Sequence, residues 1–274
     1  MIKQITSYHG SKKALFPYLR DLIPRDADNF CEPFCGSAVM SVNLDFRSYL
    51  LNDRGKLIYN LFCILRDRRK EFIELCRLTP CDSETFRLAK ERLTSKDDMH
   101  RAWAFFTTMN YSFARTGKQF VGYYLSAHGR TSAGFGHTTG NKLDFLESDR
   151  FKQFIRKATV VNKDACKFIK FLGQKNPKTY SMFIYCDPPY VDTHMGGYEG
   201  DYSLEDFKNL LETLKDVKNH KWMLSCFSNP LVESYKEKYN WFKKSFSLPQ
   251  RVSTNKKEEC VYTNYKMEVV NSLL

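Results

Sequence analysis

Residues 29–38 have the sequence NFCEPFCGSA, in which a short apolar run passes into a turn of small residues. The run is typical of a buried strand, and residues 39–44 have the pattern of a helix. A second strand is expected at residues 48–51, just before Asp53, and a long amphipathic pattern covers residues 57–78. Two consecutive strand-and-helix units predict a parallel sheet and therefore an α/β fold.

The later part of the chain returns to sheet character after a different intervening segment. Further strands are expected at residues 158–162, 182–186, 221–227, 241–247 and 260–265, of which the last two form an antiparallel pair. Between the two sheet-forming parts, helical periodicity predominates. We therefore expect residues 1–57 and 151–274 to form one domain around the sheet, and residues 58–150 to form an inserted, mainly helical domain.

Length and charge limit the kind of protein this is. With 274 residues, of which 42% are hydrophobic, the chain can bury a full core as one large domain or as one domain with an insertion. Lys and Arg together number 43 against 31 for Asp and Glu, which gives a formal net charge of +12. This balance favours a polyanionic partner, although charge alone also fits a solvated basic surface.

The cysteines and histidines do not have metal-ligand spacing. The 9 cysteines contain no C-x-x-C pair, and the 6 histidines have no H-x₃₋₅-H spacing, so a metal site is not expected. Several cysteines lie in apolar runs, as reduced cysteines do in proteins of a reducing compartment. The N-terminal residues lack a signal-peptide h-region, and no stretch approaches the ~20 apolar residues of a membrane span. We expect a cytoplasmic protein without a membrane partner.

The tetrapeptide Asp187-Pro188-Pro189-Tyr190 follows the strand at residues 182–186 and has the character of an active-site loop. Two prolines make the loop rigid and remove its N–H donors, so it presents hydrogen-bond acceptors. The Asp187 carboxylate and the Pro188 carbonyl could accept both N–H groups of an exocyclic amine, such as that of adenine, while it attacks an electrophile. Tyr190 offers a face for a base extruded from a duplex. The alternative is a surface turn that merely contains two prolines.

Acidic residues end the neighbouring strands. Gly36 lies in the turn after the first strand, Asp53 ends the second and Asp164 follows the third. Because the carboxyl ends of parallel strands meet at one edge of a sheet, these residues and Asp187 should line one crevice. A tight turn and an acid for ribose hydroxyls suit a nucleoside-containing cofactor, although glycine in such a turn also serves packing.

Residues 115–142 combine glycines with basic and aromatic side chains. This composition fits a hairpin or loop against nucleic acid, although an ordinary long loop is the alternative. We take Arg115, Lys118 and Arg130 as candidate DNA contacts. Most basic side chains at such an interface contact phosphates, and fewer contact base edges.

Together these motifs resemble those of the Dam-type (alpha-group) S-adenosylmethionine-dependent DNA adenine N6-methyltransferases. The resemblance rests on residues 29–44, Asp53, the tetrapeptide at 187–190 and the N-terminal Tyr8-His9-Gly10-Ser11-Lys12. It implies a Rossmann-like methyltransferase sheet, S-adenosylmethionine as cofactor, double-stranded DNA as partner and flipping of the target adenine. It does not imply an obligate protein partner.

Site residues follow from the same resemblance, by position. The implied catalytic residues are Asp187, Pro188, Pro189 and Tyr190. The implied cofactor contacts are Tyr8, Gly10, Lys12, Glu32, Phe34, Gly36, Asp53, Asp164 and Asp187. The chain departs from the family pattern at Ala38, where a second glycine is common, and at Ala165, where an aromatic residue often follows the acid.

The expected activity is transfer of a methyl group to the N6 amine of adenine at a specific DNA site. Two alternatives stay open. The chain could methylate another planar amine, in RNA, at cytosine N4 or in a protein glutamine, or it could be a catalytically silent DNA-binding regulator on the same fold. Residues 58–150 correspond to the family's target-recognition region but match it only in general character, so the recognised DNA sequence, GATC or another, is not indicated.

Overall fold

A seven-stranded sheet with the strand order β3-β2-β1-β4-β5-β7-β6 organises the chain. The computed structural model describes residues 2–7, 10–121, 134–174, 181–190, 202–246 and 258–268. The strands are β1 (Asn29–Glu32), β2 (Ser48–Asn52), β3 (Ala158–Val161), β4 (Met182–Cys186), β5 (Lys221–Phe227), β6 (Phe242–Phe246) and β7 (Glu259–Thr263). β1 to β5 pair in parallel, and β7 pairs antiparallel with both β5 and β6. The predicted α/β class, parallel strands and closing antiparallel pair are confirmed.

The strand order reverses direction between β1 and β4. From β1 the chain proceeds outward through β2 to β3, and from β4 it proceeds the other way to β5. When the chain leaves two adjacent parallel strands toward opposite faces of the sheet, the two connections diverge at the carboxyl ends of those strands. A crevice opens between them. The sheet topology therefore places the predicted turn after β1 beside the predicted loop after β4.

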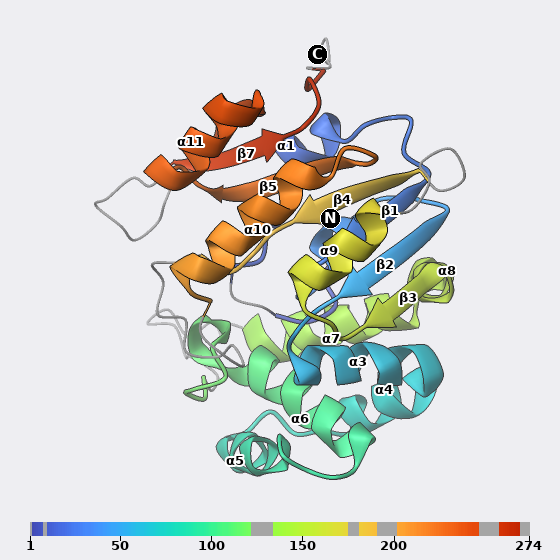
Figure 1. The fold of residues 1–274 in the computed structure, drawn as a ribbon. Coiled ribbons are helices and arrows are strands. Elements are labelled where there is room, and N and C mark those ends of the chain that lie inside the picture. The colour runs from blue at the N-terminus through green and yellow to red at the C-terminus, as the bar shows by residue number, and fades with distance from the viewer. Residues whose placement is uncertain are drawn as a thin grey trace.

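Helices cover both faces of the sheet (Figure 1). Those outside the inserted segment are α1 (Phe16–Leu19), the 3₁₀ turn η1 (Arg20–Leu22), α2 (Val39–Asn43), α9 (Ala165–Gly173), α10 (Leu204–Asp216) and α11 (Pro230–Tyr239). α9, α10 and α11 pack on one face, where Cys31 and Ile184 point, and the other core contains Phe30 and Tyr185. Alternate residues of β1 and β4 are thus buried on opposite faces, which explains their continuous apolar sequences. No helix in the described ranges is both long and apolar enough to cross a bilayer.

The segment between β2 and β3 is mainly helical; in Figure 1 its helices α3 to α6 lie together below the sheet, and α8 lies beside β3. Its helices are α3 (Lys56–Asp67), α4 (Arg69–Arg77), α5 (Ser83–Arg92), α6 (Asp98–Tyr111), the 3₁₀ turn η2 (Phe113–Arg115), α7 (Gly134–Glu147) and α8 (Asp149–Lys157). The amphipathic pattern of residues 57–78 forms two helices, because the chain leaves helical geometry at Arg68 (φ −133°, ψ 35°).

The prediction of a loop or hairpin over residues 115–142 is wrong at its C-terminal end, where α7 begins at Gly134. This helix forms because Leu143 and Leu146 are buried in the core, which outweighs the low helix propensity of the glycines. A hairpin-like turn does exist at the start of the stretch. Phe113 N–H donates to the Gln119 carbonyl (2.8 Å), and Ser112 and Phe120 form an antiparallel bridge.

A buried amide joins the carboxyl ends of β1, β2 and β3. The side chain of Asn52 is inaccessible to solvent. Its Nδ2 donates to the Pro33 carbonyl (2.8 Å) and to the Lys163 carbonyl (3.1 Å), and its Oδ1 accepts from Lys163 N–H (2.8 Å). Cys35 N–H donates to the Asn52 carbonyl (2.9 Å). Asn52 therefore sets the relative positions of three loops that follow these strands.

Replacing Asn52 with alanine should lower the free energy of unfolding by about 3 kcal/mol, because it leaves buried carbonyl and amide groups unpaired. Equilibrium urea denaturation measures this change. Asn219→Ala is the control, since Asn219 makes one exposed bond, to the Gly173 carbonyl, and its loss should cost less than about 1 kcal/mol. Equal effects of the two substitutions would contradict the role assigned to Asn52.

Candidate active site

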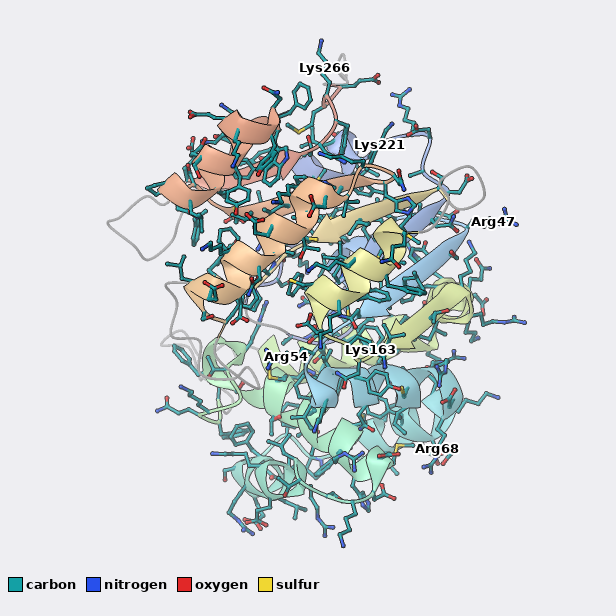
Figure 2. All side chains as sticks on the ribbon, in the orientation of Figure 1. Arg47, Arg54, Arg68, Lys163, Lys221 and Lys266 are labelled. Carbon is teal, nitrogen blue, oxygen red and sulfur yellow. The ribbon has the colours of Figure 1, made fainter. Side chains whose placement is uncertain are left out.

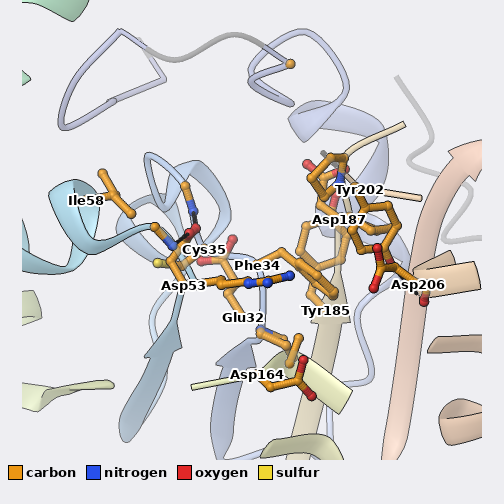
Figure 3. A pocket seen from close by; sticks show the side chains of 18 of the residues that line it. Glu32, Phe34, Cys35, Asp53, Ile58, Asp164, Tyr185, Asp187, Tyr202 and Asp206 are labelled. Carbon is orange, nitrogen blue, oxygen red and sulfur yellow. Dashed lines mark hydrogen bonds between the residues drawn. The ribbon is translucent and has the colours of Figure 1, made fainter. Parts of the chain in front are cut away.

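A cavity of about 370 Å³ opens at the carboxyl ends of β1, β2 and β4. Figure 3 shows Asp53 and Asp187 reaching it from different strands, with Phe34 between them in this view. The sequence-predicted residues that line it are Gly10, Lys12, Glu32, Phe34, Gly36, Asp53, Asp164, Asp187, Pro188, Pro189 and Tyr190. Tyr8 lies outside the described residues. The structure thus brings to one cavity residues that are as far apart in the sequence as Gly10 and Tyr190.

The turn after β1 requires unusual backbone geometry. Gly36 (φ 44°) and Ala38 (φ 49°, ψ 40°) both have left-handed conformations. Glycine adopts this conformation without strain, whereas the same conformation costs alanine about 1 kcal/mol. Ala38 therefore keeps the backbone shape that a second glycine would give, and the departure from the family pattern does not close the turn.

The Asp53 carboxylate is oriented by two backbone amides. Its Oδ2 accepts from Gly36 N–H and its Oδ1 from Gly55 N–H, each at 2.9 Å. The acid is thereby coupled to the turn after β1, and both line the cavity. Asp164 is exposed and is the N-cap of α9, where it accepts from Lys167 N–H (2.9 Å).

Glu32 is a buried acid at the end of β1, only 3% exposed. Its Oε2 accepts from the backbone N–H of Ser41 (3.1 Å) and from the Ser41 hydroxyl. Burial raises the pKa of Glu32 to about 8, against the opposing effect of the Ser41 hydrogen bonds. One oxygen of this carboxylate therefore orients α2, and the residue contributes a protonatable group to the cavity wall.

Lys12 lies at the centre of the charged part of the cavity and is 7% exposed. Its Nζ is 2.7 Å from Asp187 Oδ1 and 3.6 Å from Glu259 Oε1, and it lies over the ring of Tyr190, 4.6 Å from the centroid. Burial alone would lower the pKa of Lys12, but the Asp187 and Glu259 carboxylates outweigh it and raise the pKa. Lys12 is therefore an ammonium ion that joins the loop after β4 to the strand β7.

The loop after β4 is held by further polar contacts. Ser225 on β5 donates its hydroxyl to Asp187 Oδ1 (3.0 Å) and is 2.9 Å from the Tyr185 hydroxyl. Tyr190 stacks on Phe227 with the ring centroids 4.2 Å apart, and its hydroxyl donates to Glu259. Burial raises the pKa of Asp187, while Lys12 and Ser225 oppose that effect.

Glu259, Ser225 and Tyr185 are site residues that the sequence patterns did not indicate. Glu259 follows Glu258 and resembles a solvated charge, and Tyr185 lies within an apolar run. The only available signal was strand order, because β5 adjoins β4 and β7 adjoins β5 once the sheet is assembled. Within the described ranges, no three His, Cys, Asp or Glu side chains are grouped so that they could hold a metal ion.

The candidate DNA contacts do not line the cavity. Arg115 and Lys118 are exposed at the turn after α6, and Arg115 has a left-handed backbone conformation (φ 62°). Arg130 lies outside the described residues. Figure 2 shows basic side chains over the whole viewed face, with Lys266 and Arg68 at opposite ends, so the net positive charge is widely spread.

Comparison with known proteins identifies a matching family. The model described as "D12 class N6 adenine-specific DNA methyltransferase" matches residues 8–255. A DNA adenine methylase of Haemophilus influenzae is 24% identical over 258 residues, which cover 90% of this chain and 86% of the relative. The type II methyltransferase M1.LlaDCHI of Lactococcus lactis subsp. cremoris is 24% identical over an alignment of 291 residues, gaps included, which covers 96% of each chain.

Similarity to a solved structure is weaker. The rRNA methyltransferase aviRa from Streptomyces viridochromogenes aligns with a TM-score of 0.32 and 11% identity, covering 90% of this chain and 80% of that one. So low a score leaves the fold assignment to rest on the strand order itself.

The raised pKa of Glu32 predicts a pH-dependent stability. Between its ordinary pKa of 4.5 and about 8, the folded chain keeps a proton that the unfolded chain has released, so stability falls as the pH rises. Glu32→Gln should abolish this component, whose slope is at most about 1.4 kcal/mol per pH unit. Denaturant unfolding of the unliganded protein between pH 5 and pH 8 measures it.

The exposed Glu237 provides the control, because Glu237→Gln should keep the wild-type slope. Identical slopes in wild type and Glu32→Gln would show that Glu32 is ionised in the folded chain at neutral pH.

Proposed function

This chain belongs to the D12 class of N6 adenine-specific DNA methyltransferases, and from that premise we propose that its methyl donor is S-adenosylmethionine and that the cavity beside Asp187 binds it. The chain is a site-specific DNA methyltransferase that acts on the N6 amine of adenine. One observation supports the proposed site above all others. The turn after β1, the acid after β2 and the rigid loop after β4 line a single cavity.

The cavity wall fits a nucleoside with an amino-acid tail. Asp53, fixed by two amides, would accept hydrogen bonds from ribose hydroxyls, and the left-handed turn at Gly36 would allow the backbone to approach the ligand. Asp164 and Phe34 suit the adenine end. The Ser11 hydroxyl is buried in this wall without a hydrogen-bond partner among the described residues, and a carboxylate of the donor would supply an acceptor.

The sulfonium of S-adenosylmethionine makes its methyl group electrophilic. The task of the protein is then to orient the amine and to stabilise the positive charge that develops on it. In the described part of the chain, Lys12 and Ser225 both contact Oδ1 of Asp187. This arrangement directs Oδ2 to accept one N–H of the amine, while the Pro188 carbonyl accepts the other.

The aromatic wall would receive the flipped base. Tyr190 and Tyr202 both line the cavity, and Tyr202 makes an edge-to-face contact with Phe34 at 6.0 Å. Contact of the base with these rings offsets part of the few kcal/mol that unstacking it costs. We assign target recognition to the inserted helical segment of residues 58–150, with the exposed turn at Phe113 to Lys118 against duplex DNA.

Asp187→Asn should reduce the rate of methyl transfer by about 10³-fold or more, because the charge that stabilises the amine is lost. Binding of S-adenosylmethionine, measured by calorimetry, should change less than about tenfold, since Asp53 and the turn after β1 are unaffected. The rate is measured with labelled donor on duplex DNA, with RNA and protein as alternative acceptors. Sequencing for N6-methyladenine identifies the target site.

The control for this substitution is Asp216→Asn, an exposed carboxylate at the end of α10. Near wild-type rates in Asp187→Asn would reject the role of Asp187. Transfer to RNA or protein in preference to duplex DNA would reject the proposed partner.

Replacing both Arg115 and Lys118 with glutamine should weaken DNA binding and make it less sensitive to salt. If each contacts one phosphate, the slope of log K against log[salt] should become shallower by about 0.9 per residue. Fluorescence anisotropy between 50 and 200 mM salt (about the range over which such slopes are resolved) measures it. Lys266→Gln, at the top of the view in Figure 2 and away from the inserted helices, should leave the slope unchanged. An unchanged slope in the double variant would remove this turn from the interface.

A further inference from the structure

Glu259 is a buried acid beside the proposed reaction centre that belongs to a distant part of the sheet. It begins β7, pairs with Phe227 of β5 across the antiparallel ladder and is 8% exposed. Its Oε1 accepts the hydroxyl of Tyr190 and lies 3.6 Å from Lys12 Nζ. One carboxylate oxygen therefore restrains two of the side chains that surround Asp187.

The hydrogen bond from the Tyr190 hydroxyl does not require Glu259 to be charged. A neutral glutamine oxygen could accept the Tyr190 hydroxyl without the desolvation cost of a buried carboxylate. With Lys12 between them, Asp187 and Glu259 give the cluster one surplus negative charge when both are ionised. Without Glu259, the pair of Lys12 and Asp187 would be neutral, at the place where a cationic methyl donor and a developing cationic amine must be stabilised.

We propose that Glu259 is a positioning residue for methyl transfer, which holds the Tyr190 ring through its hydroxyl and shares the Lys12 ammonium with Asp187, the closer of its two carboxylate partners. This inference rests on the proposed function of the cavity. The positive charge of Lys12 is then divided between two carboxylates, which maintains the acceptor strength of Asp187 toward the amine. Tyr190, stacked on Phe227 and under Lys12, is thereby held in one ring orientation in the cavity wall.

Two substitutions of Glu259 separate its charge from its hydrogen bond. Glu259→Gln keeps an acceptor for Tyr190 and should lower kcat about 10-fold, whereas Glu259→Ala loses both contacts and should lower kcat about 100-fold. KM for S-adenosylmethionine should stay within about threefold, since the nucleoside side of the cavity is unchanged. Glu258→Gln is the matched control, because the neighbouring Glu258 is exposed and lies 3.8 Å from Lys243, outside the cavity.

A double substitution tests whether Glu259 acts through Tyr190. Tyr190→Phe combined with Glu259→Ala should be no more than about threefold slower than Glu259→Ala, because the alanine variant has already released the hydroxyl. Independent, multiplying losses would overturn this coupling. A kcat of Glu259→Gln and Glu259→Ala within about threefold of wild type, with or without a lower melting temperature, would overturn the proposal; if only Glu259→Gln folds, its kcat decides.

Different results would reject the proposed function of the cavity and the proposed role of Glu259. A wild-type protein that binds DNA but transfers no methyl group from S-adenosylmethionine to adenine would reject the function proposed for the cavity. A wild-type protein that methylates adenine, together with fully active Glu259 variants, would reject only the role of Glu259.

Discussion

The hydrogen bonds of the buried Asn52 side chain hold the carboxyl ends of three parallel strands in fixed relation, and the cavity depends on that constraint. Backbone groups that leave a sheet lose their ladder partners, and burial without replacement partners is costly. The side-chain amide of Asn52 supplies new hydrogen-bond partners to backbone groups in the loops after both β1 and β3. Asp53, the next residue along the chain, then captures the amide of Gly36. The acid, the turn and the third strand end are thus one hydrogen-bonded unit.

Charge is distributed with opposite signs on the surface and in the cavity. The chain carries a formal net charge of +12, yet the carboxylates of Asp53, Asp164 and Asp187 gather at one edge of the sheet, beside the protonated Glu32. A basic exterior attracts a polyanion over distances of about a Debye length. The acidic cavity favours a small cation, because interactions within it are less screened than those in water. The first property suits a DNA methyltransferase because its macromolecular substrate is anionic, and the second suits the cationic methyl donor that we propose.

Local patterns predicted the strands and the positions where they end, because strands buried on both faces are read directly as apolar runs. The convergence of Gly36, Asp53 and Asp187 followed from the parallel arrangement alone. Glu259 could not be found in this way, since its proximity to Lys12 depends on the pairing of β5 with β7 and not on any local signal. The helix α7 was missed for a related reason. Burial of Leu143 and Leu146 in the core stabilises the helix by more than the low helix propensity of the nearby glycines destabilises it. Helix propensity is a local quantity and does not include this burial.

Backbone strain coincides with the regions assigned to function. In the described residues, the non-glycine residues with positive φ are Ala38, Arg115 and Asn240. Asn240 ends α11, where asparagine is an ordinary left-handed cap. Alanine and arginine do not favour the left-handed conformation, so Ala38 and Arg115 each adopt it at a cost of about 1 kcal/mol or more. Ala38 shapes the cavity wall and Arg115 lies on the exposed turn after α6. A strained backbone conformation persists only where surrounding contacts hold it in place. The strain at Ala38 and Arg115 therefore agrees with the rigid donor site and the rigid DNA-facing turn that we propose.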